Sequence, residues 1–380
     1  MRSTVDLVLR RARPGDRSQV AGLLSRAHWR HFHLDWRDPL DVLSQEPNLL
    51  AYHGDRLVAH FASPPDPDRT AWIRSFCVDA SQAPLAVWRP LWAEAAAACL
   101  ALQVGRVASL LSGEWMRPLL IEAGFRESNA VIFFEWRGSA PDLPPSTLGQ
   151  VRPLRQTDLP AVAGVDERAF APLWRNSLES LSAAMSQAIV ATGVEADGRL
   201  VAYQLTTASP FGAHLARLAV DPAFQRKGLA TGLVVDLIHH LGRRGFDSVT
   251  LNTQADNLRS QDLYRGLGFR ETGQRYPVFE TALSVPEGTA LSVPEGHPGG
   301  DRASSRPRTP EGHPGGDPED GVPQGTALSV PVGIGREGGF VVSPNHVAPA
   351  HRASASTPFA LYPLQGTRRG ARRGEGGGSE

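Results

Sequence analysis

The stretch that decides the fold is "AVDPAFQRKGLATGLVVDLIHHL", residues Ala219 to Leu241. An apolar run ends at Val220, and the "DP" after it does not extend a strand, because proline has no N–H group to donate to a ladder. From Leu229 onward the apolar residues recur at the spacing of one helix face. The stretch therefore predicts a strand that leads through a short basic loop, "QRKG", into an amphipathic helix.

The loop has the properties of an anion site. A helix N-terminus carries unpaired N–H groups and about half a positive charge, so it attracts anions. Gly228 lets an anion approach the backbone and permits a positive φ. The amides of Gln225, Arg226 and Lys227 can form a nest, and the two basic side chains add charge at its rim. We predict that this loop binds a diphosphate; a plain loop with exposed basic side chains is the alternative.

Short motifs recur once along the chain at a nearly constant offset. Matching pairs begin at Arg13 and Arg155, at Gly54 and Asp197, at Cys77 and Ala219, and at Gly124 and Gly268. These pairs predict two copies of one domain of about 140 residues. Copy one spans residues 1–137 and copy two spans residues 151–281. The proline- and serine-rich residues 138–150 are the expected linker.

Each copy interleaves short strands with helices, which predicts an α/β (α+β) fold with a mixed central sheet flanked by helices. Residues 282–380 differ in character, since they are rich in Gly and Pro and repeat "TALSVPEG" and "PEGHPGGD". That composition predicts a disordered tail.

Composition argues against several classes of protein. The formal net charge is +0, so no overall field attracts nucleic acid or a membrane surface. Two cysteines are too few for a disulfide framework. No window reaches the ~20 apolar residues that cross a bilayer, and the N-terminus has no apolar signal segment. We expect a cytoplasmic protein, monomeric or homodimeric, for which nucleic acid is an unlikely partner.

The stretch "LAVDPAFQRKGLATGL" resembles motif A of the GNAT superfamily of N-acetyltransferases, whose signature is Q/R-x-x-G-x-G/A. Gln225, Gly228 and Ala230 occupy the three signature positions. Downstream, "LNTQADNLRSQDLYRGLGF" is similar to the family's next segment, with Asn257 and Tyr264 at its Asn and Tyr positions. The resemblance covers copy two. A tandem chain with only its second copy intact is similar in layout, and in layout alone, to mycothiol synthase.

The resemblance implies acetyl-CoA as co-substrate and no metal. It implies that the diphosphate lies on the amides around Arg226 to Ala230. It also implies a bulged, splayed strand near Leu218 to Val220, whose free backbone groups pair with the pantetheine arm as an added strand would. The predicted cofactor-binding residues are Leu218, Ala219, Val220, Gln225, Arg226, Lys227, Gly228, Leu229, Ala230, Thr231 and Asn257.

The resemblance also assigns the chemistry. Direct transfer in a ternary complex depends on alignment of the two substrates. Tyr264 is the expected general acid, because a phenol with a pKa of about 10 is protonated at neutral pH. Relatives often place a Glu base where this chain has Asn252, so His214 becomes the candidate base. The predicted substrate-binding residues are Phe170, Trp174, Tyr203 and Asn252, with Arg175 as a further candidate.

Copy one lacks these features. Gln82 is followed by no glycine, Pro84 interrupts the loop, and Leu120 stands at the Tyr264 position. We expect a degenerate copy that shapes the acceptor channel, lined by "HWRHFHLDW" with Trp29, His31, His33 and Trp36.

The predicted function is transfer of acetyl from acetyl-CoA to a primary amine, on a small molecule or a protein N-terminus. Two alternatives stay open. One is a non-catalytic acyl-CoA sensor; the other is an interaction protein that acts through its Arg- and Gly-rich tail.

Overall fold

The computed structural model describes residues 7–138, 150–209 and 212–284, and two short strands, β16 (Gly333–Ile334) and β17 (Phe340–Val341), which pair with each other. The predicted disordered tail lies almost wholly outside these residues, and so does its Arg- and Gly-rich end. Ala282, the first residue assigned to the tail, is the last residue of a strand. Among the described helices, none is both long and apolar enough to cross a membrane.

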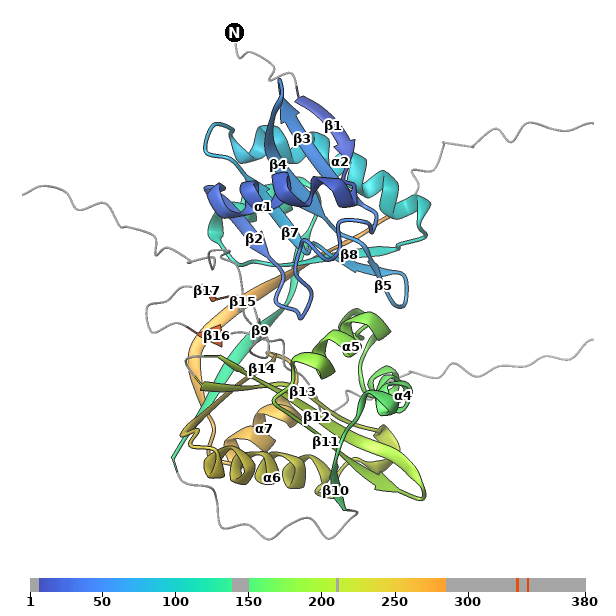
Figure 1. Ribbon diagram of the computed structural model, residues 1–380, viewed down its shortest axis with the longest axis vertical. Helices are drawn as coiled ribbons and strands as arrows, with labels where there is room; N and C mark the ends of the chain where they lie inside the picture. The colour runs from blue at the N-terminus through green and yellow to red at the C-terminus, as the bar shows by residue number, and fades with distance from the viewer. Residues whose placement is uncertain (1–6, 139–149, 210–211, 285–332, 335–339, 342–380) are drawn as a thin grey trace, which may run out of the picture.

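A similar order of elements occurs twice, in the upper and lower halves of Figure 1. Copy one contains β1 (Leu7–Arg11), η1 (Pro14–Asp16), α1 (Arg17–Arg26), β2 (Trp29–Phe32), β3 (Asn48–His53), β4 (Arg56–Ala62), β5 (Pro65–Asp66), β6 (Thr70–Trp72), β7 (Ser75–Val78), α2 (Pro84–Ala101), β8 (Arg106–Leu110), η2 (Glu114–Met116), α3 (Arg117–Glu122) and β9 (Arg126–Arg137).

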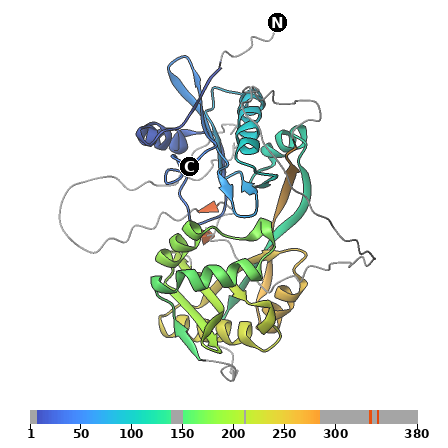
Figure 2. The ribbon, with the colours of Figure 1, turned by 90° about the vertical axis from the view of Figure 1, so that its right-hand side faces the viewer.

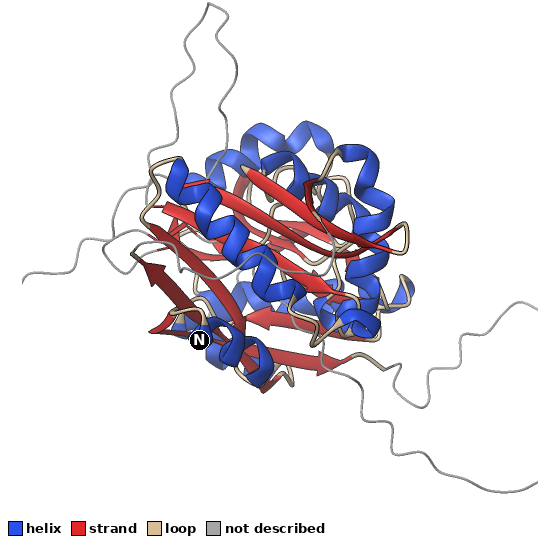
Figure 3. Ribbon diagram, turned by 90° about the horizontal axis from the view of Figure 1, so that it is seen from below, coloured by secondary structure: helices blue, strands red, loops and turns tan. Residues whose placement is uncertain are grey.

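Copy two contains β10 (Val151–Pro153), η3 (Gln156–Asp158), α4 (Leu159–Ala169), η4 (Pro172–Trp174), α5 (Leu178–Gln187), β11 (Val190–Ala196), β12 (Arg199–Ser209), β13 (Gly212–Val220), η5 (Pro222–Phe224), α6 (Leu229–Arg243), β14 (Ser248–Gln254), α7 (Leu258–Gly266) and β15 (Arg270–Ala282). Copy one has a strand, β2, where copy two has η4 and α5, and several short strands where copy two has the single strand β13. Helices lie on both faces of the strands, as Figures 2 and 3 show. The predicted α/β class with two tandem copies is confirmed.

Equivalent ion pairs appear in the two copies. Arg10 and Asp16 are joined by a contact of 2.7 Å, and Arg152 and Asp158, each 142 positions later, by one of 2.9 Å. Each carboxylate also accepts from a backbone N–H group, that of Arg13 or Arg155, at the start of its 3₁₀ turn. The second pair of matches, Arg26–Asp79 and Arg168–Asp221, has the same offset. The repeat is therefore one of side-chain contacts as well as of strand order.

The last strand of each copy pairs with the other copy. A ten-stranded sheet runs in the order β10-β11-β12-β13-β14-β9-β15-β8-β6-β5. Within it β9 of copy one lies beside β14 of copy two, and β15 of copy two lies beside β8 of copy one. Figure 1 shows β9 and β15 as two long strands that join the halves. A second sheet, β1-β3-β4-β7-β2, belongs to copy one alone.

The exchange carries side chains into the opposite core. Phe134 and Trp136 on β9 pack with the apolar face of α6 in copy two. Phe279 on β15 packs in the core of copy one under α2. Because each core needs residues from the other copy, the two copies form one folding unit in this arrangement.

Candidate active site

A cavity of about 330 Å³ opens at the start of α6. It lies where the end of β13, the following loop and the N-termini of α6 and α7 meet. Seven of the predicted cofactor-binding residues line it: Val220, Gln225, Arg226, Gly228, Leu229, Ala230 and Thr231. Residues predicted from sequence are thus brought together around one hollow.

The backbone of the loop turns as an anion site requires. Gly228 is the N-cap of α6 with a φ of 80°, and Arg226 has a φ of 59°. Both values lie in the left-handed region, where alternate residues aim successive N–H groups at one point. An added Cβ at Gly228 would meet no atom within 4 Å, so the space above the helix start is open. These residues fit a diphosphate.

The basic side chains of the loop differ in position. Arg226 lines the cavity, together with Arg259 from α7. Lys227 instead lies with its ammonium 4.7 Å from the centre of the Phe224 ring, and it is absent from the cavity lining. Gln225 donates from its side chain to the carbonyl of Val220 at 3.1 Å, which ties the loop to the strand end.

Strand β13 separates from β14 half-way along its length. Ala213 to Leu215 pair with β14 in parallel, and the pairing then stops. At this point the register with β12 shifts, so that Ala216 is left over between the partners of Leu205 and Thr206. The bulge therefore lies at Ala216, just before the predicted Leu218 to Val220. Among the described strands, none pairs with residues 217–220 on the side of β14.

Tyr264 lies inside copy two. Its side chain is fully buried, and its hydroxyl has no hydrogen-bond partner in the structure. The ring packs against Phe269 of its own copy and against Phe134, which β9 brings from copy one. Burial raises the pKa of Tyr264 above its ordinary value, so the phenol stays protonated through the neutral range. A buried hydroxyl without a hydrogen-bond partner is unfavourable in a protein core. It fits a site in which a bound ligand supplies the partner.

Asn257 caps helix α7. Its side-chain oxygen accepts from the N–H group of Ser260 at 3.2 Å, and the residue is 6% exposed. The cap fixes the start of the helix that carries Tyr264. Its contact with a cofactor stays a prediction.

Asn252 and His214 lie on the opposite face of the sheet from α6. Asn252 is fully buried and stands opposite Phe133 of β9. The Nδ1 atom of His214 lies 2.8 Å from Oγ1 of Thr250, and the ring is 4% exposed. The base role of His214 stays a prediction.

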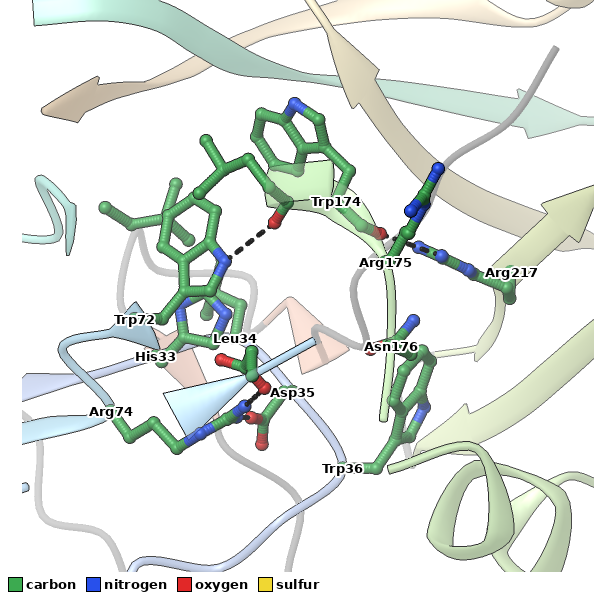
Figure 4. A pocket seen from close by; sticks show the side chains of 13 residues that line it. His33, Leu34, Asp35, Trp36, Trp72, Arg74, Trp174, Arg175, Asn176 and Arg217 are labelled. Carbon is green, nitrogen blue, oxygen red and sulfur yellow. Dashed lines mark hydrogen bonds and ion pairs between the residues drawn. The ribbon is translucent and has the colours of Figure 1, made fainter. Parts of the chain in front are cut away.

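Two of the predicted substrate-binding side chains, Phe170 and Tyr203, contact a buried ion pair. Arg217 contacts both carboxylate oxygens of Asp166 at 2.8 and 2.9 Å, and these side chains are 3% and 1% exposed. Tyr203 donates its hydroxyl to Asp166 at 2.5 Å. Phe170 lies under the guanidinium of Arg217, 3.3 Å from ring centre to Cζ. Tyr203 and Phe170 thus support Arg217, whereas Trp174 and Arg175 line a second cavity between the copies (Figure 4).

In copy one the equivalent of the separated strand is covered. Strand β2 pairs antiparallel with all of Ser75 to Val78, and the N–H group of His28 adds a bond to the carbonyl of Val78. His31 on β2 is buried inside copy one, bonded to Ser112 and to the carbonyl of Ile73, and burial lowers its pKa to about 4. Of the four aromatic residues predicted to line an acceptor channel, His33 and Trp36 line the cavity between the copies. Trp29 and His31 instead form the covering strand.

Comparisons with known proteins agree with this geometry. Residues 152–269 match the acetyltransferase (GNAT) family. The [ribosomal protein bS18]-alanine N-acetyltransferase of Salmonella typhimurium is 35% identical over 129 residues, which are 34% of this chain and 86% of that protein. A mycothiol acetyltransferase of Nocardia farcinica is 42% identical over 52 residues, 14% of this chain and 17% of that protein. A tandem GNAT protein from the clavulanic acid biosynthesis pathway shares the fold, with a TM-score of 0.51 at 16% identity over 74% of this chain and 99% of that one.

Proposed function

The chain belongs to the GNAT family of acetyltransferases, and from this premise we propose that copy two, residues 151–281, transfers acetyl from acetyl-CoA to a primary amine. The family match lies wholly within copy two. The observation that carries the proposal is that copy two combines an open loop at Gly228, an unpaired strand edge at residues 217–220 and an unpartnered hydroxyl on Tyr264.

Acetyl-CoA supplies the activated acetyl group. We assign its diphosphate to the amides that follow Arg226 and its pantetheine arm to the edge of residues 217–220. An arm paired there as an extra strand gains backbone hydrogen bonds and a fixed direction. This alignment in one ternary complex supplies much of the rate enhancement of a direct transfer.

In the transfer a C–N bond forms and the C–S bond breaks. Tyr264 gives its proton to the departing sulfur, and the amine loses a proton to a base. Asn252 has no basic group and cannot accept that proton. His214 contacts Thr250, two positions before Asn252, and so lies on the same face of the sheet as Asn252. It stays our candidate for the base. The acceptor is a small amine or a protein N-terminus; the Salmonella relative is named for an alanine of ribosomal protein bS18.

The proposal also explains copy one. Its strand edge is covered by β2, and Pro84 at the first position of α2 removes one of the N–H groups an anion would use. We therefore expect one acetyl-CoA per chain, and calorimetry on the whole chain measures that number.

The chemical role is tested by Tyr264→Phe. Turnover should fall about 100-fold, the lower end of what general acid–base catalysis contributes, while the affinity for acetyl-CoA stays unchanged. The measurement is thiol release from acetyl-CoA with a panel of monoamines, diamines and a peptide that begins with Ala.

Tyr52→Phe is the matched control, because its hydroxyl contacts Arg10 and Gln19 in copy one and not the site. Equal turnover of Tyr264→Phe and the unaltered protein would remove Tyr264 from the acid role. Binding of acetyl-CoA without thiol release on any amine would favour a sensor.

A further inference from the structure

A second cavity lies between the two copies. Its volume is about 40 Å³, which holds roughly three water-sized groups, so it admits the end of a small molecule and not a whole one. Its walls are aromatic, with Trp36 and Trp72 from copy one and Trp174 from copy two (Figure 4). We call it the inter-copy cavity.

Both copies fix the loop that closes the cavity. The indole N–H of Trp72 donates to the carbonyl of Leu173 at 3.0 Å. Arg217 donates to the carbonyl of the next residue, Trp174, at 2.9 Å, and is itself held by Asp166. A loop anchored at adjacent carbonyls from two sides keeps the cavity wall in place.

The charges at the cavity do not balance. Arg74 is 7% exposed and contacts two carboxylates, Asp35 and Asp66, whose side chains are 8% and 5% exposed. The other two cations in the lining already have partners, since Arg175 pairs with Asp68 at 2.7 Å and Arg217 pairs with Asp166. Among the residues that line the cavity one negative charge is left in excess, and Arg37, outside the lining, is a further cation near it.

Asp66 carries that excess. Burial raises the pKa of Asp66 to about 7, against the opposing effects of the charge of nearby Arg37 and of a backbone hydrogen bond from Trp72. Its Oδ1 atom contacts Arg74 at 2.5 Å, and its Oδ2 atom is buried without a hydrogen-bond partner. A buried carboxylate oxygen without a donor is unfavourable, and a cation between aromatic walls is favourable. The cavity therefore matches the chemistry of an ammonium group.

The cavity lies on the acceptor side of the proposed reaction. Phe133 stands opposite Asn252 in the strand register, so the two side chains share a face of the sheet. Phe133 also packs in one apolar cluster with Trp72, Leu110 and Leu173, all of which line the cavity. Phe133 thus links the lining of the cavity to the strand that carries Asn252.

We propose that the inter-copy cavity binds a second, positively charged nitrogen of the acceptor, which is therefore a small diamine or an amine of similar charge pattern. Asp66 accepts from that nitrogen, and the three indoles surround it. Copy one thus selects the acceptor that copy two acetylates. This inference rests on the proposed function, because only that function makes the bound amine an acceptor of acetyl. The test of binding itself does not need acetyl-CoA.

The test compares diamines with monoamines of equal carbon number. Diamines from 1,3-diaminopropane to 1,5-diaminopentane and the matching n-alkylamines are titrated into the whole chain by calorimetry, with the quenching of tryptophan fluorescence as a second readout. Each titration is run with free protein and with saturating CoA. We expect the best diamine to bind at least about tenfold more tightly than its monoamine, as a hydrogen bond to a charged group implies.

Asp66→Asn keeps the shape of the side chain and removes its charge. We expect it to abolish the preference for the diamine and to leave the affinity for acetyl-CoA unchanged. Asp55→Asn is the matched control, because Asp55 is an exposed carboxylate in the turn between β3 and β4 and should keep the preference. Equal binding of diamines and monoamines by the unaltered chain would overturn the proposal even if Asp66→Asn did not fold.

The same preference in Asp66→Asn as in the unaltered protein would also overturn it. Failure of acetyl-CoA to bind while diamines bind through Asp66 would contradict the proposed function and retain the cavity as an ammonium site. Thus the two proposals fail on different measurements.

Discussion

Copies one and two share one plan and differ along the edge of a single strand. In copy one, β2 pairs with residues 75–78; in copy two, the equivalent residues 217–220 have no strand on that side among those described. The loop to the next helix differs as well. The N-cap Ala83 follows Asp79 by four positions, whereas Gly228 follows Asp221 by seven.

The difference teaches that a binding site can be lost while the fold is kept. A short strand of the same copy takes the hydrogen bonds that a ligand would take, and a shortened loop with proline at the helix start removes the anion site. Copy one then contributes in another way. Its β9 packs against Tyr264, and its Asp35, Asp66 and Arg74 face the loop of copy two.

The largest expected effect is that of Gly228→Val, which should remove the cofactor site that distinguishes copy two from copy one. A side chain at a φ of 80° strains the backbone, and its Cβ enters the open space over the helix start. We expect at least about a 100-fold loss of acetyl-CoA affinity, which corresponds to ~2.7 kcal/mol, by calorimetry.

Gly198→Val is the matched control for that strain. Gly198 has a φ of 70° in the turn between β11 and β12, with no atom within 4 Å of an added Cβ. It should lose similar stability, ~1–2 kcal/mol, and keep its affinity. Unchanged affinity in Gly228→Val would refute the placement of the diphosphate.

A second test imports residues of copy one into copy two. Leu24 and Ser75 stand at the positions that Asp166 and Arg217 occupy 142 residues later. Asp166→Leu alone leaves Arg217 buried without its partner and should cost about 3–5 kcal/mol in the free energy of unfolding, measured in urea.

The double variant Asp166→Leu/Arg217→Ser removes both charges and should recover part of that loss. A double variant less stable than Asp166→Leu would show that the ion pair is not the cause.

The smallest expected effects on stability concern the ion pairs that the two copies share. Asp158→Asn and Asp16→Asn each remove a carboxylate that caps a turn and pairs with an arginine, so each should cost about 1 kcal/mol. The ion pair and the backbone bond lower the pKa of Asp158 from 3.8 to about 2. Its stabilising effect is therefore complete above about pH 4 and is lost as the pH falls through 2.

Unfolding curves between pH 2 and pH 6 measure this dependence. Different costs at the two sites would show that the copies are not equivalent there.

The loop and helix of copy two could be predicted from sequence because their signals are local. The proline after Val220, the glycine at the helix start and the apolar spacing of α6 all lie within one short stretch. The tandem repeat could be predicted because the motifs recur at a constant offset. The bulge was expected near Leu218 to Val220 and lies at Ala216; periodicity does not reveal which residue a register shift leaves over.

The exchange of β9 and β15 could not be predicted, because the apolar pattern of a strand indicates its buried face and not the strand with which it pairs. For the same reason the inter-copy cavity was predicted only in part: His33, Trp36 and Trp174 were expected at the acceptor site, whereas Asp66 was not. Asp66 and Trp174 are far apart in the sequence, and only strand pairing brings their elements together. The carboxylates at this cavity, Asp35 and Asp66, come from copy one, whereas the substrate-binding residues were predicted in copy two. The sequence signal that could have pointed to these carboxylates is the presence in copy one of charged residues for which no role was predicted.

The most direct test is hydrogen exchange of the whole chain with and without acetyl-CoA, read by mass spectrometry on peptides that cover residues 217–220 and 75–78. We predict that acetyl-CoA slows exchange at residues 217–220, whose outer edge is unpaired. Residues 75–78 should already exchange slowly under β2 and should not change. Equal slowing at both strands, or slowing at residues 75–78 alone, would contradict the assignment of the cofactor to copy two.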